Sequence, residues 1–394
     1  MKRENYKRLG DFIRQVDVRN RDLAVTNLLG VSISKTFIPS IANTIGTDMS
    51  TYKIVEPYQF AYGPVTSRNG DKITFALYKG KEKCIISSAY VTFEIVDKEI
   101  IDPDYLMMWA LRPEFDRYAR FMSNGSAREV FSWDEMCEVY LPVPGIEEQR
   151  RIVSAYHAVE ARIDANVAFV TKLEDTAQTI YQKMFVDDVA LDHLPDGWHI
   201  ATIKDLVQVK GGKRLPKGEE LIGVPNSHPY IKVADMTAYR FVELNDTFQY
   251  VPDGVQPSIA RYIVEEGDVI LSIVGTIGNV NIVGSSLHKA NLTENCVKLI
   301  GNKNLTNLLY SFLTSSEGKK QIEQATVGGV QGKLPIYNIE KLKLLVPDDN
   351  ALKEFNARMA VINKAMTNAI KENDLLKRLL LVIQSNISVD KEDL

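Results

Sequence analysis

The sequence predicts an α+β protein in which two similar globular domains are joined by two long helices. Three observations predict this class. The stretches 146–185 and 348–388 have the heptad spacing of coiled-coil helices. Each follows a short apolar strand that ends in proline, and the remaining segments mix strand and helix patterns. Regular βαβ alternation is absent, which disfavours a doubly wound sheet.

Composition is that of an ordinary globular protein and excludes several classes. A chain of 394 residues suggests two or three domains. The net charge of −4, from 47 Lys+Arg and 51 Asp+Glu, argues against a polybasic DNA binder but allows local basic clusters. The three cysteines include no CxxC pair, so a disulfide framework or zinc knuckle is not expected. No apolar run is long enough to span a membrane, and a cytoplasmic protein is expected.

The first long helix is predicted over 146–185, which contains neither glycine nor proline. Counted in alternating steps of three and four, its seam is apolar except at Asn166. The second helix has a similar seam, interrupted only at Asn373. The two seams correspond at an offset of 203 positions, since Val143-Pro144 precedes the first helix and Val346-Pro347 the second (346 − 143). This agreement indicates an internal duplication.

The two helices are predicted to pair with each other in an antiparallel coiled coil of about 35 residues, roughly 50 Å long. Placing Asn166 opposite Asn373 fixes the register, because a slipped pairing leaves a buried amide without a partner. The same register places Ile163 with Leu376, Val170 with Ala369, Val159 with Leu380 and Met184 with Phe355. The alternative is that each helix packs on its own domain and both asparagines face solvent.

The predicted organisation has four segments: a first globular domain over 1–145, a helix over 146–186, a second globular domain over 187–347, and a helix with a tail over 348–394. Strands are predicted at 85–96 and 268–275, and helices at 105–122 and 305–325.

No constellation of catalytic residues emerges from the sequence. A phosphate-binding GxxxxGK[ST] loop, an HExxH motif and a clustered His/Cys set are all absent. A methyltransferase tetrapeptide with Pro-Pro is excluded because no Pro-Pro occurs. We therefore expect neither a catalytic residue nor a metal site.

Polar loops that contain glycine are the remaining candidates for a binding surface. Glycine allows close approach of a phosphate, Lys and Arg supply charge, and Arg, Lys, Asn and Gln read base edges. For each residue the alternative is a solvated turn. The residues predicted to bind DNA are Arg68, Asn69, Lys72, Lys81, Arg128, Lys210, Lys213, Arg214, Lys217, Thr276, Asn279, Gln331 and Lys333. No segment is basic overall, so this binding is expected to be modest and salt-sensitive.

Three motifs resemble the specificity subunit of Type I restriction–modification enzymes. LPVPGIEEQRRIV (141–153) opens the first helix and IYQKMF (180–185) closes it, while GDVILSIVGTIGNVNIV (267–283) lies in the second domain. LPDGWHIATIKDLVQVKGGKRLPKG (194–218) is similar to the family's entry into a second recognition domain. The resemblance covers nearly the whole chain. The second helix departs from the pattern by lacking the Glu-Gln pair at its start.

The resemblance implies a non-catalytic subunit whose two target-recognition domains each read one part of a split, asymmetric site in double-stranded DNA. The helices would set the gap between the two parts. Two methyltransferase subunits, contacted through Glu148 and Gln149, would methylate adenine at N6. The resemblance also implies that two restriction subunits would join in restriction-competent assemblies. S-adenosylmethionine, ATP and Mg would belong to these partners. The alternatives are a protein-interaction scaffold that has lost DNA reading, and an enzyme in its own right.

Overall fold

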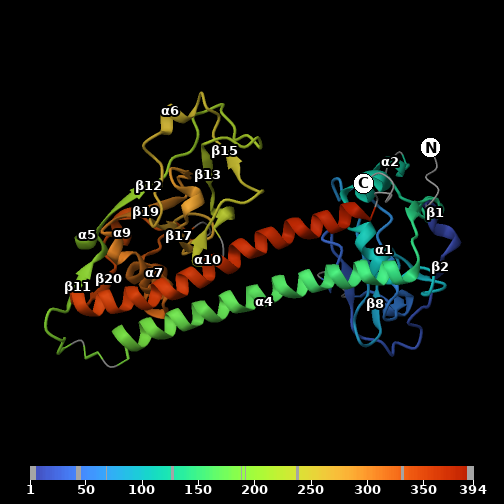
Figure 1. Cartoon of the computed structure of the whole chain (residues 1–394), viewed down its shortest axis with the longest axis horizontal. Coiled ribbons are helices and arrows are strands. Elements are labelled where there is room, and N and C mark those ends of the chain that lie inside the picture. The colour runs from blue at the N-terminus through green and yellow to red at the C-terminus, as the bar shows by residue number, and fades with distance from the viewer. Residues whose placement is uncertain are drawn as a thin grey trace. The chain divides into compact units, whose positions relative to one another are not determined.

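The structure is a computed structural model of the chain (Figure 1). It describes residues 6–40, 46–67, 69–125, 128–187, 189–190, 192–236, 239–329 and 332–387. The chain forms two compact units, which are Met1–Ile163 with Leu376–Leu394 (unit 1) and Asp164–Leu375 (unit 2). The helices α4 (Ile146–Phe185) and α10 (Asp349–Asn386) contribute residues to both units. The predicted fold class, with two mixed domains and two long helices, is confirmed.

Unit 1 is built around an antiparallel sheet of four strands. These are β2 (Ile13–Val16), β9 (Val91–Ile95), β6 (Phe60–Tyr62) and β7 (Phe75–Leu77), in that order. Three strand pairs surround it: β1 (Tyr6–Arg8) with β10 (Tyr140–Pro142), β3 (Leu29–Val31) with β4 (Phe37–Pro39), and β5 (Lys53–Val55) with β8 (Cys84–Ile86). The helices are α1 (Pro103–Ala110), α2 (Pro113–Met122) and α3 (Trp133–Cys137).

Unit 2 contains a corresponding sheet with one more strand. Its order is β12 (Val207–Gly211), β19 (Cys296–Gly301), β16 (Val269–Ser272), β17 (Val280–Val283) and β14 (Phe241–Val242). A second sheet joins β15 (Gln249–Tyr250), β13 (Pro229–Ile231) and β18 (Asn291–Leu292), and β11 (His199–Thr202) pairs with β20 (Lys343–Val346). The helices are α5 (Ile203–Leu206), α6 (Gln256–Ile259), α7 (Thr306–Thr314), α8 (Ser316–Ala325) and α9 (Ile336–Ile339).

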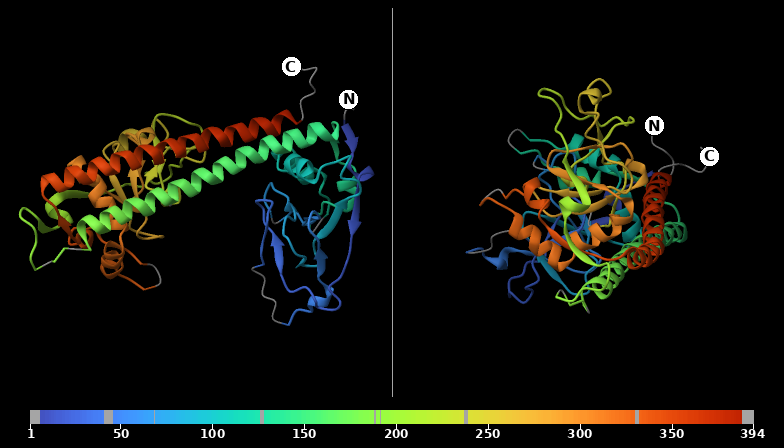
Figure 2. Two further views of the ribbon diagram at one scale, coloured as in Figure 1. Left: turned by 60° about the horizontal axis from the view of Figure 1, so that its bottom comes forward. Right: turned by 90° about the vertical axis from the view of Figure 1, so that its left-hand side faces the viewer.

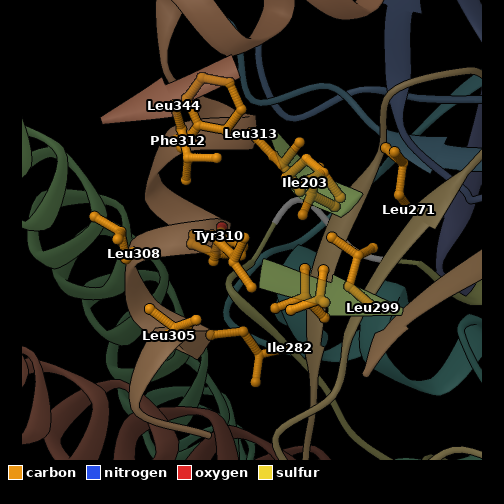
Figure 3. Close-up of a cluster of buried hydrophobic side chains, with 14 of the residues drawn as sticks. Ile203, Leu271, Ile282, Leu299, Leu305, Leu308, Tyr310, Phe312, Leu313 and Leu344 are labelled. Atoms are coloured by element: carbon orange, nitrogen blue, oxygen red, sulfur yellow. The ribbon is translucent and has the colours of Figure 1, made fainter. Parts of the chain in front are cut away.

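The core of unit 2 lies between this sheet and the helices. Figure 3 shows Leu271, Ile282 and Leu299 of the strands in one cluster with Leu308 and Phe312 of α7. The sequence pattern explains this packing, because apolar residues recur at helical spacing in α7 and make up most of the two fully buried strands β16 and β17.

The two units share a common set of elements. The helix pair α1–α2 corresponds to α7–α8, and the strand before each long helix, β10 or β20, pairs with the first strand of its own unit. The long helices begin 203 positions apart (146 and 349). A bridge between Asn124 and Val130 recurs at the same offset between Val327 and Lys333. The duplication predicted from sequence is therefore present in the backbone hydrogen bonding.

The two long helices pair as predicted within each unit. In unit 2, Nδ2 of Asn166 donates to Oδ1 of Asn373 and to Oε2 of Glu372, both at 2.9 Å. Further along, the Phe355 ring lies 5.1 Å from that of Phe185, so one helix runs against the direction of the other (Figures 1 and 2). In unit 1, Nε2 of Gln384 donates to the Tyr156 hydroxyl at 3.1 Å.

Every predicted seam position is buried or half-buried. In unit 2 these include Val170 and Ala369, and in unit 1 they include Ile163 and Leu376. Met184, expected opposite Phe355, packs against the same core, but the rings that contact Phe355 belong to Tyr181 and Phe185. Near the end of α4, the residues that contact α10 therefore include positions outside the predicted heptad seam.

Replacing Asn166 and Asn373 together by leucine is expected to leave stability unchanged or to raise it, because no buried amide remains unpaired. Replacing Asn166 alone is expected to cost about 1–3 kcal/mol, since the buried Asn373 side chain then loses the hydrogen bond that Asn166 donates to it. Thermal unfolding measures both effects.

The double variant is also expected to lose its unique register. Cysteines at Val170 and Ala369 should crosslink in the parent chain. In the double variant a slipped pair, Val170 with Ile362, should crosslink as well. Retention of the native crosslink alone would contradict a register-setting role for the asparagines.

Candidate nucleic-acid interface

One edge of the unit 2 sheet gathers the ends of three strands. The ladders place Gly211 of β12 opposite Val297 of β19, and Ser272 of β16 opposite Cys296. The loops that leave β12 and β16 therefore emerge side by side. We call residues 211–218, 273–279 and the described part of 327–333 the unit 2 edge.

The β16–β17 turn at this edge is held by its own polar groups. The Ser272 hydroxyl donates to the Thr276 carbonyl oxygen at 2.6 Å and accepts from the Asn279 amide at 2.9 Å. Gly275 and Gly278 have φ of 80° and 92°, a region that disfavours other residues. The turn therefore presents Thr276 and Asn279 in a fixed conformation.

The loop after α8 lies against this turn. Val274 forms a β-bridge with Lys333, and the Leu334 amide donates to the Ile273 carbonyl oxygen at 3.0 Å. Lys333 is exposed. Thus Lys333, which is far from Thr276 and Asn279 in sequence, lies on a loop that adjoins theirs. Gln331 lies outside the described residues.

The β12 exit brings Lys213 and Arg214 to the same edge. The Lys213 amide donates to the Leu292 carbonyl oxygen at 2.8 Å. A Cβ at Gly212 would lie 2.2 Å from the Thr293 carbonyl oxygen, so this approach requires glycine. Arg214 is well exposed, and its Nε lies 2.9 Å from Oε1 of Glu294. Glu294, which the sequence did not single out, pairs with Arg214 through Nε, so the terminal nitrogens of the exposed guanidinium are the ones expected to bind a base or phosphate.

The other two basic residues of this segment are placed differently. Lys217 is exposed on the unit 2 edge. Lys210 is exposed but lies within β12, where it is opposite Lys298 in the ladder. Lys210 therefore belongs to the sheet rather than to the loops.

Unit 1 has a corresponding edge, which we define as residues 63–72 and 123–130 within the described parts of the chain. The Phe131 amide donates to the Pro64 carbonyl oxygen at 2.8 Å, as Leu334 does to Ile273 in unit 2. The Thr66 hydroxyl donates to the Ser123 hydroxyl at 2.9 Å. The same two loops therefore adjoin in both units.

The residues of the unit 1 edge that were predicted to bind DNA differ in how free their side chains are to contact it. Lys72 and Arg128 are exposed. Nδ2 of Asn69 donates to the Val65 carbonyl oxygen at 3.2 Å, so this amide also serves the turn itself. Arg68 lies outside the described residues.

Lys81 is separate from the other unit 1 candidates. Its loop joins β7 to β8, and the Tyr58 amide donates to the Tyr78 carbonyl oxygen at 2.7 Å. This bond places the loop where β6 begins, whereas the unit 1 edge lies where β6 ends. The two ends of an antiparallel hairpin cannot form one surface.

The structure corrects the prediction that Gln149 contacts a partner subunit. The Gln149 side chain is fully buried in unit 1. Its amide accepts from the Asp102 backbone N–H at 2.9 Å and donates to the carbonyl oxygens of Ile100 and Pro144 at 2.9 and 2.8 Å. Gln149 therefore fastens the start of α4 to its own domain. Glu148 is half-buried and binds Arg151 through both carboxylate oxygens, and its contact with a partner stays a prediction.

A buried ion pair anchors the unit 1 edge and was missed from sequence. Nζ of Lys35 lies 2.8 Å from Oδ1 of Asp116, and both side chains are nearly inaccessible. The same carboxylate accepts from the Ile73 amide at 3.1 Å, directly after the edge loop. Burial lowers the pKa of Lys35, while the Asp116 carboxylate opposes that shift. A lone lysine and a lone helical aspartate give no sequence signal of such a pair.

The described part of the chain contains no group of three or more His, Cys, Asp or Glu side chains able to hold a metal ion. Among the helices that the structure describes, none is long and apolar enough to cross a membrane.

The chain is similar to proteins of Type I restriction systems. Residues 195–384 match the family described as Type I restriction modification DNA specificity domain. The chain is 21% identical over 303 residues to the Type I restriction enzyme MjaIX specificity subunit of Methanocaldococcus jannaschii, covering 72% of this chain and 68% of that one. It is 18% identical over 445 residues to the HindI specificity subunit of Haemophilus influenzae, covering 93% and 95%.

The fold is also similar to a solved structure. The S subunit of a Type I restriction–modification system from M. genitalium superposes with a TM-score of 0.54 at 13% identity, covering 99% of this chain and 98% of that one. At this identity the likeness shows the fold alone.

Proposed function

Because the chain belongs to the family of Type I restriction–modification specificity subunits, we propose that it reads a bipartite, asymmetric DNA site for such a complex. The observation that carries this proposal is the repeated edge. Each unit has a corresponding pair of adjoining loops at the edge of its own sheet. The side chains on these loops differ: they include Lys72 and Arg128 in unit 1, and Asn279 and Lys333 in unit 2. Two readers of one architecture and different chemistry suit a site whose halves differ.

The chemistry of these side chains fits base and phosphate contacts. An asparagine amide pairs with adenine in the major groove, and lysine binds guanine or phosphate. The near-neutral net charge of −4 offers little bulk attraction to DNA, so positioned contacts and partner subunits would supply the affinity.

We further propose that two methyltransferase subunits bind this chain and that restriction subunits join them in restriction-competent assemblies. S-adenosylmethionine, ATP and Mg would be held by those partners and the reaction would take place in the cytoplasm. The relatives are specificity subunits, which are non-catalytic. In this assignment the chain aligns DNA while the partner flips and methylates adenine.

Paired alanine variants test the proposal. Asn279→Ala with Lys333→Ala is expected to relax base preference about tenfold in one half-site, since a bidentate base contact contributes about 1–3 kcal/mol of discrimination. Lys72→Ala with Arg128→Ala should affect only the other half-site and serves as the matched control. Methylome sequencing of a strain that carries this subunit with its methyltransferase measures both.

The outcomes separate the alternatives. If neither pair of substitutions changes the sites methylated, these loops do not read DNA. If the parent complex methylates without any sequence preference, the chain is a scaffold that has lost DNA reading. Methylation by the purified chain without partners would instead indicate an enzyme.

A further inference from the structure

Arg240 is the largest fully buried side chain of the described residues. Its Nε and Nη2 each lie 3.1 Å from a carboxylate oxygen of Glu174, forming a two-pronged ion pair. The guanidinium carbon also lies 4.4 Å from the centre of the Tyr310 ring. All three residues belong to unit 2, and none is on the unit 2 edge.

These contacts join three elements. Glu174 is on α4, Tyr310 is on α7, and Arg240 directly precedes β14. β14 runs beside β17, and the Ile282 amide donates to the Arg240 carbonyl oxygen at 2.8 Å. β17 begins directly after Asn279. A short series of bonded elements therefore leads from α4 to the turn at the unit 2 edge.

A buried ion pair is an inefficient source of stability, because removing both charges from water costs as much as their attraction returns. What it provides is geometry. The planar guanidinium donates two parallel hydrogen bonds to a carboxylate in one orientation, and the Tyr310 ring that packs on its face fixes the plane of the guanidinium. An apolar contact between a sheet and a helix would allow small sliding or rotation, whereas this pair allows one position.

The arrangement is specific to unit 2. At the repeat offset of 203, Glu174 corresponds to Lys377 and Tyr310 to Met107. Neither residue in unit 1 reproduces the acid or the ring. Removing the pair should therefore act on one domain alone.

We propose that Arg240 and Glu174 are positioning residues that fix the second recognition domain on α4 and so restrict the complex to one gap length between half-sites. This inference rests on the proposed function and adds a determinant of gap length that contacts no base. The pair would act through the β14–β17 strands on the turn that carries Thr276 and Asn279.

The test uses Arg240→Met combined with Glu174→Leu, which removes both charges and leaves neither buried alone. The assembled complex with its methyltransferase is given a DNA library that keeps both half-sites and varies the gap by single base pairs. The parent should methylate one gap. The double variant is expected to increase methylation at the neighbouring gaps at least tenfold, with unchanged half-site bases.

Two controls keep the result interpretable. Lys303→Met removes an ion pair with Asp268 in the same domain that involves no residue of α4, and should leave the gap profile unchanged even if stability falls. Arg240→Lys keeps the charge but loses the two-pronged hydrogen bond of the guanidinium, and is expected to give an intermediate gap profile. This variant also provides the test should the double variant fail to fold.

An unchanged gap profile in a folded double variant, or equal broadening in Lys303→Met, would overturn the positioning role. Failure of the proposed function looks different, because then the parent itself shows no dependence on half-sites or gap.

Discussion

Lengthening α4 and α10 by one matched heptad is expected to widen the gap of the recognised site by about three base pairs without changing either half-site. Seven helical residues add about 10 Å, and each base pair of B-DNA occupies about 3.4 Å. Inserting one heptad after Val167 and the other after Lys371 keeps Asn166 opposite Asn373. Methylome sequencing reports both half-sites and the gap in one measurement.

The matched control inserts the heptad in α4 alone. The seam beyond Val167 then loses its partners, and Val170 no longer faces Ala369. Methylation should fall at every gap rather than move to a new one. A matched insertion that changed half-site bases while the gap stayed constant would contradict the role of the helices as a spacer.

The helical part of this protein could be predicted because its signal is periodic. Apolar residues recur through both seams, and the exception in each, Asn166 and Asn373, selects a partner. The repeat offset follows from the same periodicity and from the strand and proline before each helix. Both are local patterns, so one sequence contains them in full.

The loops could be predicted only in part. Glycine and polar residues correctly indicated turns at both edges, but not that the turn before Asn279 and the loop of Lys333 adjoin, which the bridge from Val274 to Lys333 shows. Composition alone could not separate Lys81, whose loop is similar in kind but lies at the opposite end of a hairpin. Turn chemistry identifies a loop, whereas strand direction decides which loops meet.

The burial of charged side chains could not be predicted from the residue types. Arg240 with Glu174, and Lys35 with Asp116, look like surface residues until distant segments are brought together. The internal duplication offered one usable signal. At the offset of 203, Gln149 corresponds to Leu352, and a position that is leucine in one copy is expected to be buried in the other.

Replacing Gln149 by alanine is expected to destabilise unit 1 by about 3–5 kcal/mol. The change removes three partly buried hydrogen bonds and creates a cavity where the fully buried side chain stood. For a unit of this size the melting temperature should fall by about 10 °C. Calorimetry of the isolated subunit measures the effect without any partner present.

Glu148→Ala is the matched control, because it changes the adjacent residue on the same helical turn and removes an ion pair with Arg151 of the same helix. It should lower the free energy of unfolding by less than about 1 kcal/mol, since ion pairs near the protein surface contribute little. A residue that binds a partner gives the opposite pattern, with a stable isolated chain and lost methyltransferase binding. If Gln149→Ala melted like the parent chain, the hydrogen bonds of Gln149 would not fasten α4 to its domain.

The variant Gln149→Leu separates the hydrogen bonds from the packing. Leucine suffices at the corresponding position of α10, so it should recover the apolar packing but not the Asp102 bond, giving a melting temperature between those of alanine and glutamine.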